Sequence, residues 1–405
     1  MGNYKTIDEL NVAGKTVLVR VDYNVPIKDG KITDATRIEK SAKTILDLSA
    51  RGAKVILLTH LGRPDGHKKP EFSLAVVLPE LSRALGNKPV AFADDCVGEP
   101  VKAAIQKLPN GQILLCENVR FHAGEEKNDP SFAAQLAELG DFYVNDAFSA
   151  AHRAHASTEG LAHLLPSAVG RLLQAELEAL QKTLENTLRP AMAIVGGAKV
   201  STKVDVLFNL LSKVDILTVG GGMANTFLVA QGLHVGKSLV DKESVSIAQK
   251  ILAEAKSQGK EILLPTDAMV APELKAHVHA DIAAVNAIPN DKMILDVGPA
   301  SVVKIAQKLA HVKTVLWNGP LGVFETPPFD RGTIAVAQEI ARLTGTGKLL
   351  SVAGGGDTVS ALEHAGVMDK LSYVSTAGGA FLEWLEGKEL PGIAALKKSP
   401  MKKAG

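Results

Sequence analysis

The stretch LLSVAGGGDTVSALEHAG, residues 349–366, carries the pattern that decides the fold. Its apolar run LLSVA predicts a short buried strand, and VSALEHAG has the spacing of a helix. A glycine loop between a strand and a helix N-terminus offers backbone N–H groups to an anion, and the helix dipole adds to the attraction. The stretch therefore predicts one strand–loop–helix unit of a parallel α/β sheet, with an anion site at its loop.

Comparable apolar runs recur along the chain, and they end in two ways. Those of the second half end in glycine, in AIVGGAK (193–199), ILTVGGG (216–222) and the stretch above. Those of the first half end in cations and polar side chains, at Asp22 and Asn24, His60 and Arg63, Arg120, and His152 and Arg153. Ligands of an open parallel sheet bind beyond the carboxyl ends of its strands. Two kinds of strand end predict two anion sites, as a transfer reaction requires.

Length and composition predict two domains and no nucleic-acid or membrane partner. The chain has 405 residues and a net charge of +1, so nothing in its overall charge favours nucleic acid. No apolar run reaches membrane-spanning length, and the N-terminus lacks the apolar core of a signal peptide. Two cysteines do not suggest a disulfide framework. We therefore expect a cytoplasmic protein.

The alternation of strands and helices also predicts where the chain divides. One helix is expected after Thr33 and Asp34, with Gly52 as its stop. Leu172–Leu188 lacks glycine and proline, and we expect it to connect the two halves. The expected parts are a first domain at 1–170, a connecting helix or hinge at 171–189, a second domain at 190–390 and a tail at 391–405.

Cationic side chains of the first half form the first candidate site. Each alone is explained by solvation or a surface ion pair. Together they lie at or near strand ends that a parallel sheet gathers on one edge, and guanidinium groups bind phosphate or carboxylate in bidentate geometry. The set predicts a site for a small phosphorylated acid, and it consists of Arg37, His60, Arg63, Arg120 and Arg153.

Two further residues of this half admit two interpretations, and Arg37 carries an additional signal. Asp22 and Asn24 either orient substrate hydroxyls or form a turn before Pro26. Arg37 lies in the first turn of its expected helix, where a cation opposes the helix dipole at a cost of a few tenths of a kcal/mol, roughly. That misfit favours a functional role for Arg37.

The glycine-rich half contains the second candidate site. Asp357 is either a helix N-cap or, beside phosphates, a ligand of Mg²⁺. Lys199 and Lys203 are four residues apart, so they share one helix face if a helix begins at this segment. Two like charges on one face are unfavourable alone but become favourable when an anion neutralises both. The Walker A pattern is absent, and GTGK (345–348) lacks its first glycine and its Ser/Thr. Neither the histidine pair at 152 and 155 nor that at 277 and 279 has an evident third metal ligand.

Taken together, these motifs closely resemble the bacterial type of phosphoglycerate kinase. The resemblance runs from RVDYNVP at Arg20 to STAGGAFLEWLEGKELPG at Ser375 and rests on HLGRP, ENVRF, AHRAHAST, GGAKVSTK, LWNGPLGVFE and GGGDT. Two small departures occur: Tyr23 stands where Phe or Leu is common, and STAGG where STGGG is common. Neither removes an expected ligand.

The resemblance implies an α/β fold of two Rossmann-like domains, each with a mostly parallel sheet flanked by helices, separated by a hinged cleft. It implies a monomer that binds 3-phosphoglycerate or 1,3-bisphosphoglycerate on the first domain and Mg²⁺ with ATP or ADP on the second, with the tail packed on the first. The implied substrate ligands are Asp22, Asn24, Arg37, His60, Arg63, Arg120 and Arg153. The implied nucleotide ligands are Lys203, Glu325, Gly355, Gly356, Asp357 and Thr358, with Asp357 holding the metal. Arg37 and Lys199 are implied to stabilise the phosphoryl group during transfer.

Two other classes of function remain as alternatives. A NAD-dependent dehydrogenase requires GxGxxG at its first helix, and neither GGAKVSTK nor GGGDT has that spacing. A non-catalytic phosphosugar-binding protein would explain the arginines but not Lys199, Lys203 and Asp357 together. Phosphoryl transfer to an ionised carboxylate needs no general base, so cations and backbone donors suffice. Because the two sites lie on different domains, we expect the domains to close on their ligands.

Overall fold

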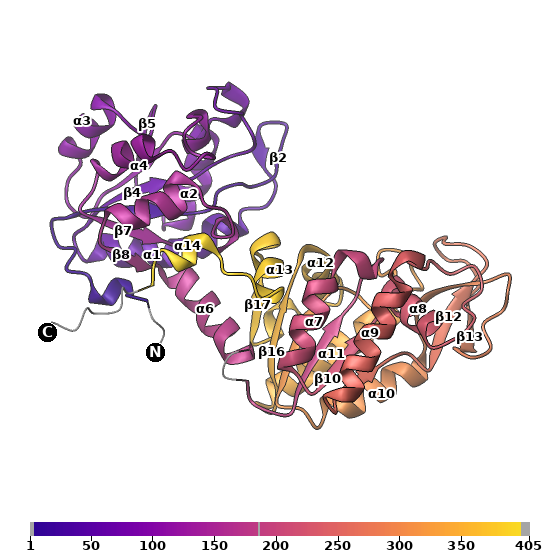
Figure 1. The fold of residues 1–405 in the computed structure, drawn as a ribbon. Coiled ribbons are helices and arrows are strands. Elements are labelled where there is room, and N and C mark those ends of the chain that lie inside the picture. The colour runs from indigo at the N-terminus through magenta and orange to yellow at the C-terminus, as the bar shows by residue number, and fades with distance from the viewer. Residues whose placement is uncertain (1–3, 185–186, 398–405) are drawn as a thin grey trace, which may run out of the picture. The chain divides into compact units, whose positions relative to one another are not determined.

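The computed structural model describes residues 4–184 and 187–397, and the chain divides into two compact units (Figure 1). One unit comprises Met1–Glu178 with Glu389–Gly405, and the other comprises Ala179–Lys388. Each contains a six-stranded parallel sheet with helices, which confirms the predicted α/β fold class.

The sheet of the first unit has the order β5-β6-β4-β1-β7-β8, with all its pairings parallel. Its strands are β1 (Thr16–Arg20), β4 (Lys54–Leu58), β5 (Val90–Ala93), β6 (Ile113–Cys116), β7 (Phe142–Asn145) and β8 (Ser167–Val169), and β2 (Ile27–Lys28) and β3 (Lys31–Ile32) form a separate ribbon. The helices are α1 (Thr36–Ala50), α2 (Leu78–Ala84), α3 (Glu99–Lys107), α4 (Pro130–Ala137), α5 (Leu161–Leu164) and α14 (Pro391–Ala394). Strand order reverses where β1 meets β7, so this pair is the switch point at which such sheets bind ligands.

Helix α1 follows the sequence prediction closely. The Asp34 carboxylate accepts a hydrogen bond from the Thr36 N–H at 2.9 Å, and Arg37 lies in the first turn. The apolar face buries Ile38 and Ile45 against the sheet. Gly52 has φ +80°, a left-handed conformation that glycine adopts without strain, and it follows the end of the helix.

The sheet of the second unit has the order β11-β10-β9-β15-β16-β17, again parallel throughout. Its strands are β9 (Ala191–Val195), β10 (Ile216–Val219), β11 (Glu261–Leu263), β15 (Thr314–Asn318), β16 (Leu350–Gly354) and β17 (Tyr373–Ser375). The helices are α7 (Val204–Lys213), α8 (Gly221–Ala230), α9 (Val245–Ser257), α10 (Pro299–Leu309), α11 (Arg331–Gly345), α12 (Gly356–His364) and α13 (Gly379–Leu385). A small antiparallel sheet consists of β12 (Asp267–Ala271), β13 (Asp281–Ala284) and β14 (Met293–Val297). The switch point here lies between β9 and β15.

Helix α6 (Arg171–Leu184) occupies much of the segment expected to connect the two halves, and the boundary between the units falls inside it. The predicted helix continued to Leu188, but residues 187–188 are not helical, and 185–186 lie outside the described residues. Near the C-terminus, the Gly392 N–H donates to the Ala151 carbonyl at 2.9 Å, so α14 packs on the first unit. Residues 398–405 of the expected tail are not described. The domain limits and the hinge stay predictions.

At the switch point of the second unit, two glycine positions have no room for a side chain of their own. A Cβ added to Gly196 would lie 1.8 Å from the Pro320 carbonyl oxygen, and one added to Gly319 would lie 2.2 Å from the Gly196 carbonyl oxygen. The Gly196 N–H also donates to the Asn318 carbonyl at 2.9 Å. Glycine at these positions lets the two backbones approach each other directly.

We predict that Gly196→Ala lowers the free energy of unfolding by about 1–3 kcal/mol or more, because the added methyl group must displace backbone. Gly345→Ala is the matched control, since a Cβ there meets no atom within 4 Å. Chemical denaturation of both variants measures the difference. Equal stabilities would contradict the proposed tight approach.

Candidate active site

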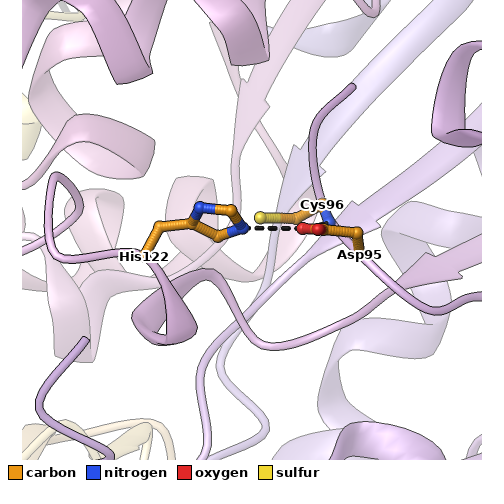
Figure 2. Close-up of side chains that lie close together, drawn as sticks. All are labelled: Asp95, Cys96 and His122. Atoms are coloured by element: carbon orange, nitrogen blue, oxygen red, sulfur yellow. Dashed lines mark hydrogen bonds and ion pairs between the residues drawn. The ribbon is translucent and has the colours of Figure 1, made fainter. Parts of the chain in front are cut away.

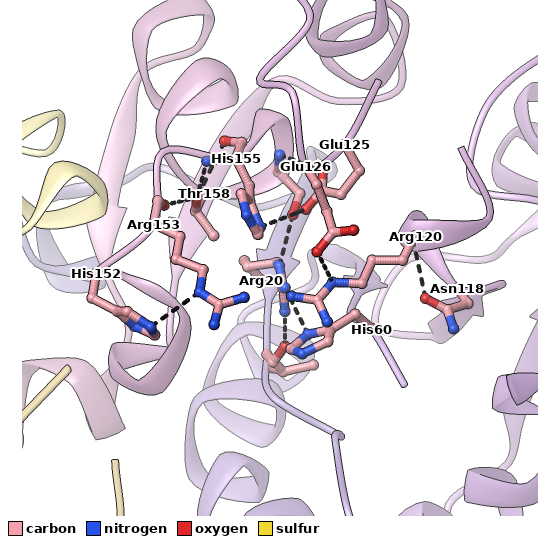
Figure 3. Close-up of polar contacts among 12 residues, drawn as sticks. Arg20, His60, Asn118, Arg120, Glu125, Glu126, His152, Arg153, His155 and Thr158 are labelled. Carbon is pink, nitrogen blue, oxygen red and sulfur yellow. Dashed lines mark hydrogen bonds and ion pairs between the residues drawn. The ribbon is translucent and has the colours of Figure 1, made fainter. Parts of the chain in front are cut away.

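Arg20 ends strand β1 and is the most deeply buried cation of the first unit's site, with 1% of its surface exposed. Its Nε donates to the Ser157 hydroxyl at 2.8 Å, and its Nη1 donates to the carbonyl of Val21. The Ser157 hydroxyl in turn donates to Glu125 Oε1 at 2.5 Å. A buried guanidinium therefore reaches a buried carboxylate through a hydroxyl group (Figure 3).

The sequence prediction missed Arg20 and Glu125 as site residues. Arg20 stands inside the apolar run VLVRV, where an unpaired charge would be costly. That cost was the signal that could have identified it. Glu125 is fully buried, and burial raises the pKa of its carboxyl group while the charge of Arg20 lowers it.

His60 lies at the centre of this cluster as a neutral ring. Burial, followed by the charges of Arg20 and Arg120, lowers its pKa well below the usual value. Its Nδ1 lies 3.0 Å from Arg20 Nη2, and arginine can only donate, so Nδ1 accepts and Nε2 carries the proton. His60 is thus fixed as an uncharged N–H donor. His155 behaves similarly: burial and the neighbouring arginines lower its pKa to about 3.

The other predicted cations lie at the same edge of the sheet but differ in how deeply their side chains are buried. Arg120 is buried and donates through Nη1 to the Gly62 carbonyl at 2.8 Å, with Nε 3.4 Å from Glu126 Oε1. Arg153 is exposed, and its Nε donates to His152 Nε2 at 3.2 Å (Figure 3). Arg63 is also exposed. The structure therefore gathers buried and exposed cations around the loops that follow β4, β6 and β7.

Asp22 and Asn24 are joined directly, since the Asn24 N–H donates to Asp22 Oδ1 at 3.0 Å. Arg37 Nη1 donates to Asp22 Oδ2 at 2.7 Å and to the Asn24 carbonyl at 3.0 Å. Asn24 Oδ1 accepts from the Gly62 N–H at 2.9 Å, which ties the loop after β1 to the loop after β4. Arg37 keeps about a third of its side-chain surface exposed, and Asp22 a tenth. Arg37 is therefore positioned by Asp22 while it stays accessible.

In the second unit, Lys203 is the cation at the switch point. Its Nζ donates to the Gly196 carbonyl at 2.7 Å and to Asn318 Oδ1 at 2.7 Å. Burial lowers its pKa to about 8, while the charge of Asp357 acts in the opposite direction. The ammonium is thus held at the carboxyl ends of β9 and β15 by uncharged oxygens.

The condition under which Lys199 and Lys203 would share one helix face is not met, because no α-helix begins at Lys199. A 3₁₀ turn (Val200–Thr202) follows Lys199, and helix α7 begins only at Val204. The GGAKVSTK segment therefore folds as a loop around Lys203, since that side chain bonds backward to the strand ends. Lys199 is exposed. Hydrogen bonds from Ser201 lower the pKa of the nearby Asp241 carboxyl group, and the charge of Lys199 adds a smaller contribution in the same direction.

The loop between β16 and α12 has the predicted strand–glycine–helix geometry. Gly355 precedes the helix with φ +99°, and Gly356 begins it. Thr358 is buried and accepts from the Gly319 N–H at 2.7 Å, which joins this loop to the one after β15. Asp357 is exposed in the first turn of the helix. It is not the residue that caps the helix, so its carboxylate remains accessible to a ligand.

A cavity of about 340 Å³ lies beside these loops within the second unit. Asp357 and Glu325 both line it. Its walls are otherwise mostly apolar and backbone, from Gly197, Gly221, Gly222, Leu239, Leu295, Pro320 and Leu321 among others. A pocket with apolar walls and few polar groups suits a small organic ligand.

A family model for phosphoglycerate kinase matches residues 7–388. The chain belongs to the phosphoglycerate kinase family. It is 61% identical over 393 residues to phosphoglycerate kinase of Rhodospirillum centenum, covering 97% of this chain and 99% of that protein. It is 58% identical over 399 residues to that of Allorhizobium ampelinum, covering 98% and 100% of the two chains.

Solved structures of phosphoglycerate kinases have the same fold. The structure from Coxiella burnetii superposes with a TM-score of 0.90 at 45% identity, and covers 97% of this chain and 98% of that one. The structure from Pyrococcus horikoshii superposes with a TM-score of 0.80 at 31% identity, with the same coverage. Within residues 4–184 and 187–397, no helix is long and apolar enough to cross a membrane.

We predict that Arg20→Met destabilises the protein by about 3–5 kcal/mol, because it leaves the Glu125 carboxylate buried without its cation. Arg63→Met is the matched control: Arg63 is exposed, so the free energy of unfolding should change by about 0.5 kcal/mol or less. Urea denaturation of both variants gives the comparison. A stable Arg20→Met protein would contradict the role assigned to this buried cation.

Proposed function

We propose that this protein catalyses reversible, Mg²⁺-dependent phosphoryl transfer between 1,3-bisphosphoglycerate and ADP, which yields 3-phosphoglycerate and ATP. The observation that carries the proposal is the match to the phosphoglycerate kinase family over residues 7–388. The geometry supports it, because one unit has a cationic edge and the other has a glycine-lined edge beside a cavity. Family membership favours this activity over a dehydrogenase and over a non-catalytic phosphosugar-binding protein.

In the first unit, we assign binding of the triose phosphate to the polar edge of the sheet. Guanidinium groups and the uncharged N–H of His60 would bind its phosphate and carboxylate groups, and Asp22 and Asn24 would accept hydrogen bonds from its hydroxyl. The proposed ligands are Asp22, Asn24, Arg37, His60, Arg63, Arg120 and Arg153. Arg20 and Glu125 act as positioning residues, because their contacts fix the tautomer of His60 and the loop at Ser157.

In the second unit, we assign binding of ADP or ATP to the cavity and its loops. The apolar walls would receive the base, Glu325 would accept from a ribose hydroxyl, and the backbone around Gly355, Gly356 and Thr358 would face the phosphates. Lys203 adds a positive charge at the end of β9. A polyphosphate there would favour its charged form and so oppose the lowering of its pKa by burial.

The residues present fit a magnesium ion at Asp357. Its carboxylate is an exposed oxygen donor that lines the same cavity, and Mg²⁺ prefers one or two carboxylates together with phosphate oxygens. When bound, the ion supplies charge neutralisation between that carboxylate and the phosphates. Asp357 itself would orient the nucleotide, since its position at the start of α12 is fixed by the bond between Thr358 and Gly319.

The reaction needs no general base, since the carboxylate of 3-phosphoglycerate is already ionised near neutral pH. Catalysis then depends on positioning and on charge stabilisation of the transferring phosphoryl group. We assign that stabilisation to Arg37 and Lys199. Arg37 is already oriented by Asp22, and both side chains are accessible to a ligand. We also propose that the active form is a monomer, as the resemblance to the family implies.

A coupled assay of ATP formation from 1,3-bisphosphoglycerate and ADP tests the activity, and Lys199→Ala tests the mechanism. We predict a fall in kcat of about 10²–10³-fold with little change in KM, because the cation acts on charge that develops during transfer. Lys250→Ala, on the exposed side of α9, should retain full activity. A variant with normal kcat and raised KM would overturn the role of Lys199.

We further propose that the two units approach each other when both ligands are bound. The assigned groups Arg37 and Lys199 belong to different units, and direct transfer requires both to reach one phosphoryl group. Small-angle scattering should show a smaller radius of gyration with 3-phosphoglycerate and Mg-ATP together than with either alone. An unchanged radius under saturation would contradict closure.

A further inference from the structure

Three side chains of different chemistry converge at the edge of the first unit, and the proposed reaction uses none of them. Asp95 and Cys96 lie two and three residues after the end of strand β5, and His122 directly follows the 3₁₀ turn (Val119–Phe121) after strand β6. These strands are parallel neighbours, paired from Val90 with Ile113 to Ala93 with Cys116. Their carboxyl ends are therefore adjacent, which brings the two loops together (Figure 2).

The three potential ligand atoms face a common point. His122 Nε2 lies 2.6 Å from Asp95 Oδ1, and the ligand atoms of Asp95, Cys96 and His122 all lie within 4.8 Å of one another. Figure 2 shows the Cys96 sulfur and the Asp95 carboxylate on the same side of the imidazole ring. Within the described parts of the chain, this is the one group of three or more His, Cys, Asp or Glu residues that converges in this way.

This arrangement fits a metal site better than a nucleophilic triad. In a triad, one ring nitrogen faces the nucleophile and the opposite nitrogen faces the carboxylate. Here Nε2 of His122 faces the carboxylate, and the sulfur lies on that same side of the ring. A tetrahedral ion with bonds of about 2.0–2.3 Å needs ligand atoms roughly 3.3–3.7 Å apart. The observed separations require small side-chain adjustments only.

The surroundings hold the ligands and leave a route for an ion. Cys96 is fully buried, whereas the side chains of Asp95 and His122 are 49% and 31% exposed, so an ion can enter from solvent past these two. The His122 ring stacks on Phe132 with 5.0 Å between ring centres. Asp95 Oδ1 also accepts from the Cys96 N–H at 2.7 Å, which fixes the turn between them.

We propose that Asp95, Cys96 and His122 form a binding site for one borderline-soft divalent transition-metal ion, with Zn²⁺ as its occupant. Thiolate and imidazole ligands select such ions over Mg²⁺, which prefers oxygen ligands in octahedral geometry. Three protein ligands leave a fourth tetrahedral position for water. On binding, the Cys96 thiol releases its proton to solvent and the imidazole proton moves to Nδ1, so that Nε2 becomes a ligand.

A metal ion bound at this site would also restrain the neighbouring loop that carries Arg120. His122 stands two residues after Arg120, whose N–H donates to Asn118 Oδ1 at 3.1 Å. An ion bound by His122 would tie the loop that carries Arg120 to the loop after β5. This coupling rests on the proposed function, whereas metal binding itself does not, and the test below measures binding alone.

The test uses the full chain freed of metal by a chelator. Titration with Zn²⁺ in competition with a chromophoric chelator should give one equivalent bound with a Kd of about 1 µM or tighter. Co²⁺ should give the absorption of a thiolate-to-cobalt transition. Cys96→Ser and His122→Asn should each weaken Zn²⁺ binding by about 100-fold or more, and Cys96→Ser should abolish the cobalt band.

Matched controls separate this site from adventitious binding. His163 is also paired with a carboxylate, Glu159, at 2.5 Å, but no cysteine belongs to that pair. His163→Asn should therefore leave the Zn²⁺ affinity unchanged. Cys116→Ala should keep the cobalt band. If Cys96→Ser does not fold, Asp95→Asn serves in its place, because the Asp95 side chain is accessible and its substitution should not disturb the fold. Zn²⁺ affinity that is equal in wild type, Asp95→Asn and His122→Asn would overturn the proposal.

Discussion

Both units depend on hydrogen bonding between one pair of interior parallel strands in each sheet. In the first unit this pair is β1 with β7, and in the second it is β9 with β15. The chain leaves these strands toward opposite sides of the sheet, so no crossover helix covers the gap between their carboxyl ends. Most candidate ligands lie in loops after the carboxyl ends of the strands, and Arg37 and Asp357 lie in the first turns of helices α1 and α12. The pairing therefore determines which residues of distant sequence become neighbours.

Both switch points hold a buried cation that has lost its hydration, and in both units neighbouring oxygen atoms replace part of the lost water. Each places a desolvated cation among oxygen atoms: Arg20 among a hydroxyl and a carbonyl, and Lys203 among carbonyls and an amide oxygen. Uncharged oxygens compensate only part of the lost hydration, which is why burial lowers the pKa of Lys203. A bound anion restores the missing compensation. At the second unit's edge, the free protein thus already carries an electrostatic preference for anionic ligands, whereas the charge of Arg20 in the first unit already faces the buried Glu125 carboxylate through Ser157.

The sequence predicted which polar and glycine residues follow the ends of strands, but it did not predict the contacts made by buried side chains. Helix α1, the loop before α12 and the parallel architecture follow from local patterns of apolar residues, glycine and helix caps. Arg20 was missed because its position in an apolar run matched a strand, and Glu125 because no local pattern marks a buried carboxylate. No helix begins at Lys199, so the condition for the lysine pair to share a face is not met; Lys203 instead bonds backward to two strand ends, a tertiary contact that local sequence does not show. Asp95, Cys96 and His122 converge only through the pairing of β5 with β6.

The return of the chain to its first unit has a topological consequence. Because Glu389–Gly405 belongs with Met1–Glu178, the polypeptide crosses between the units twice, and the second unit is an insertion with both ends tethered. A single tether would allow one unit to swivel about it freely. Two tethers restrict such swivelling, and a backbone cut at either crossing would remove one of the two restraints.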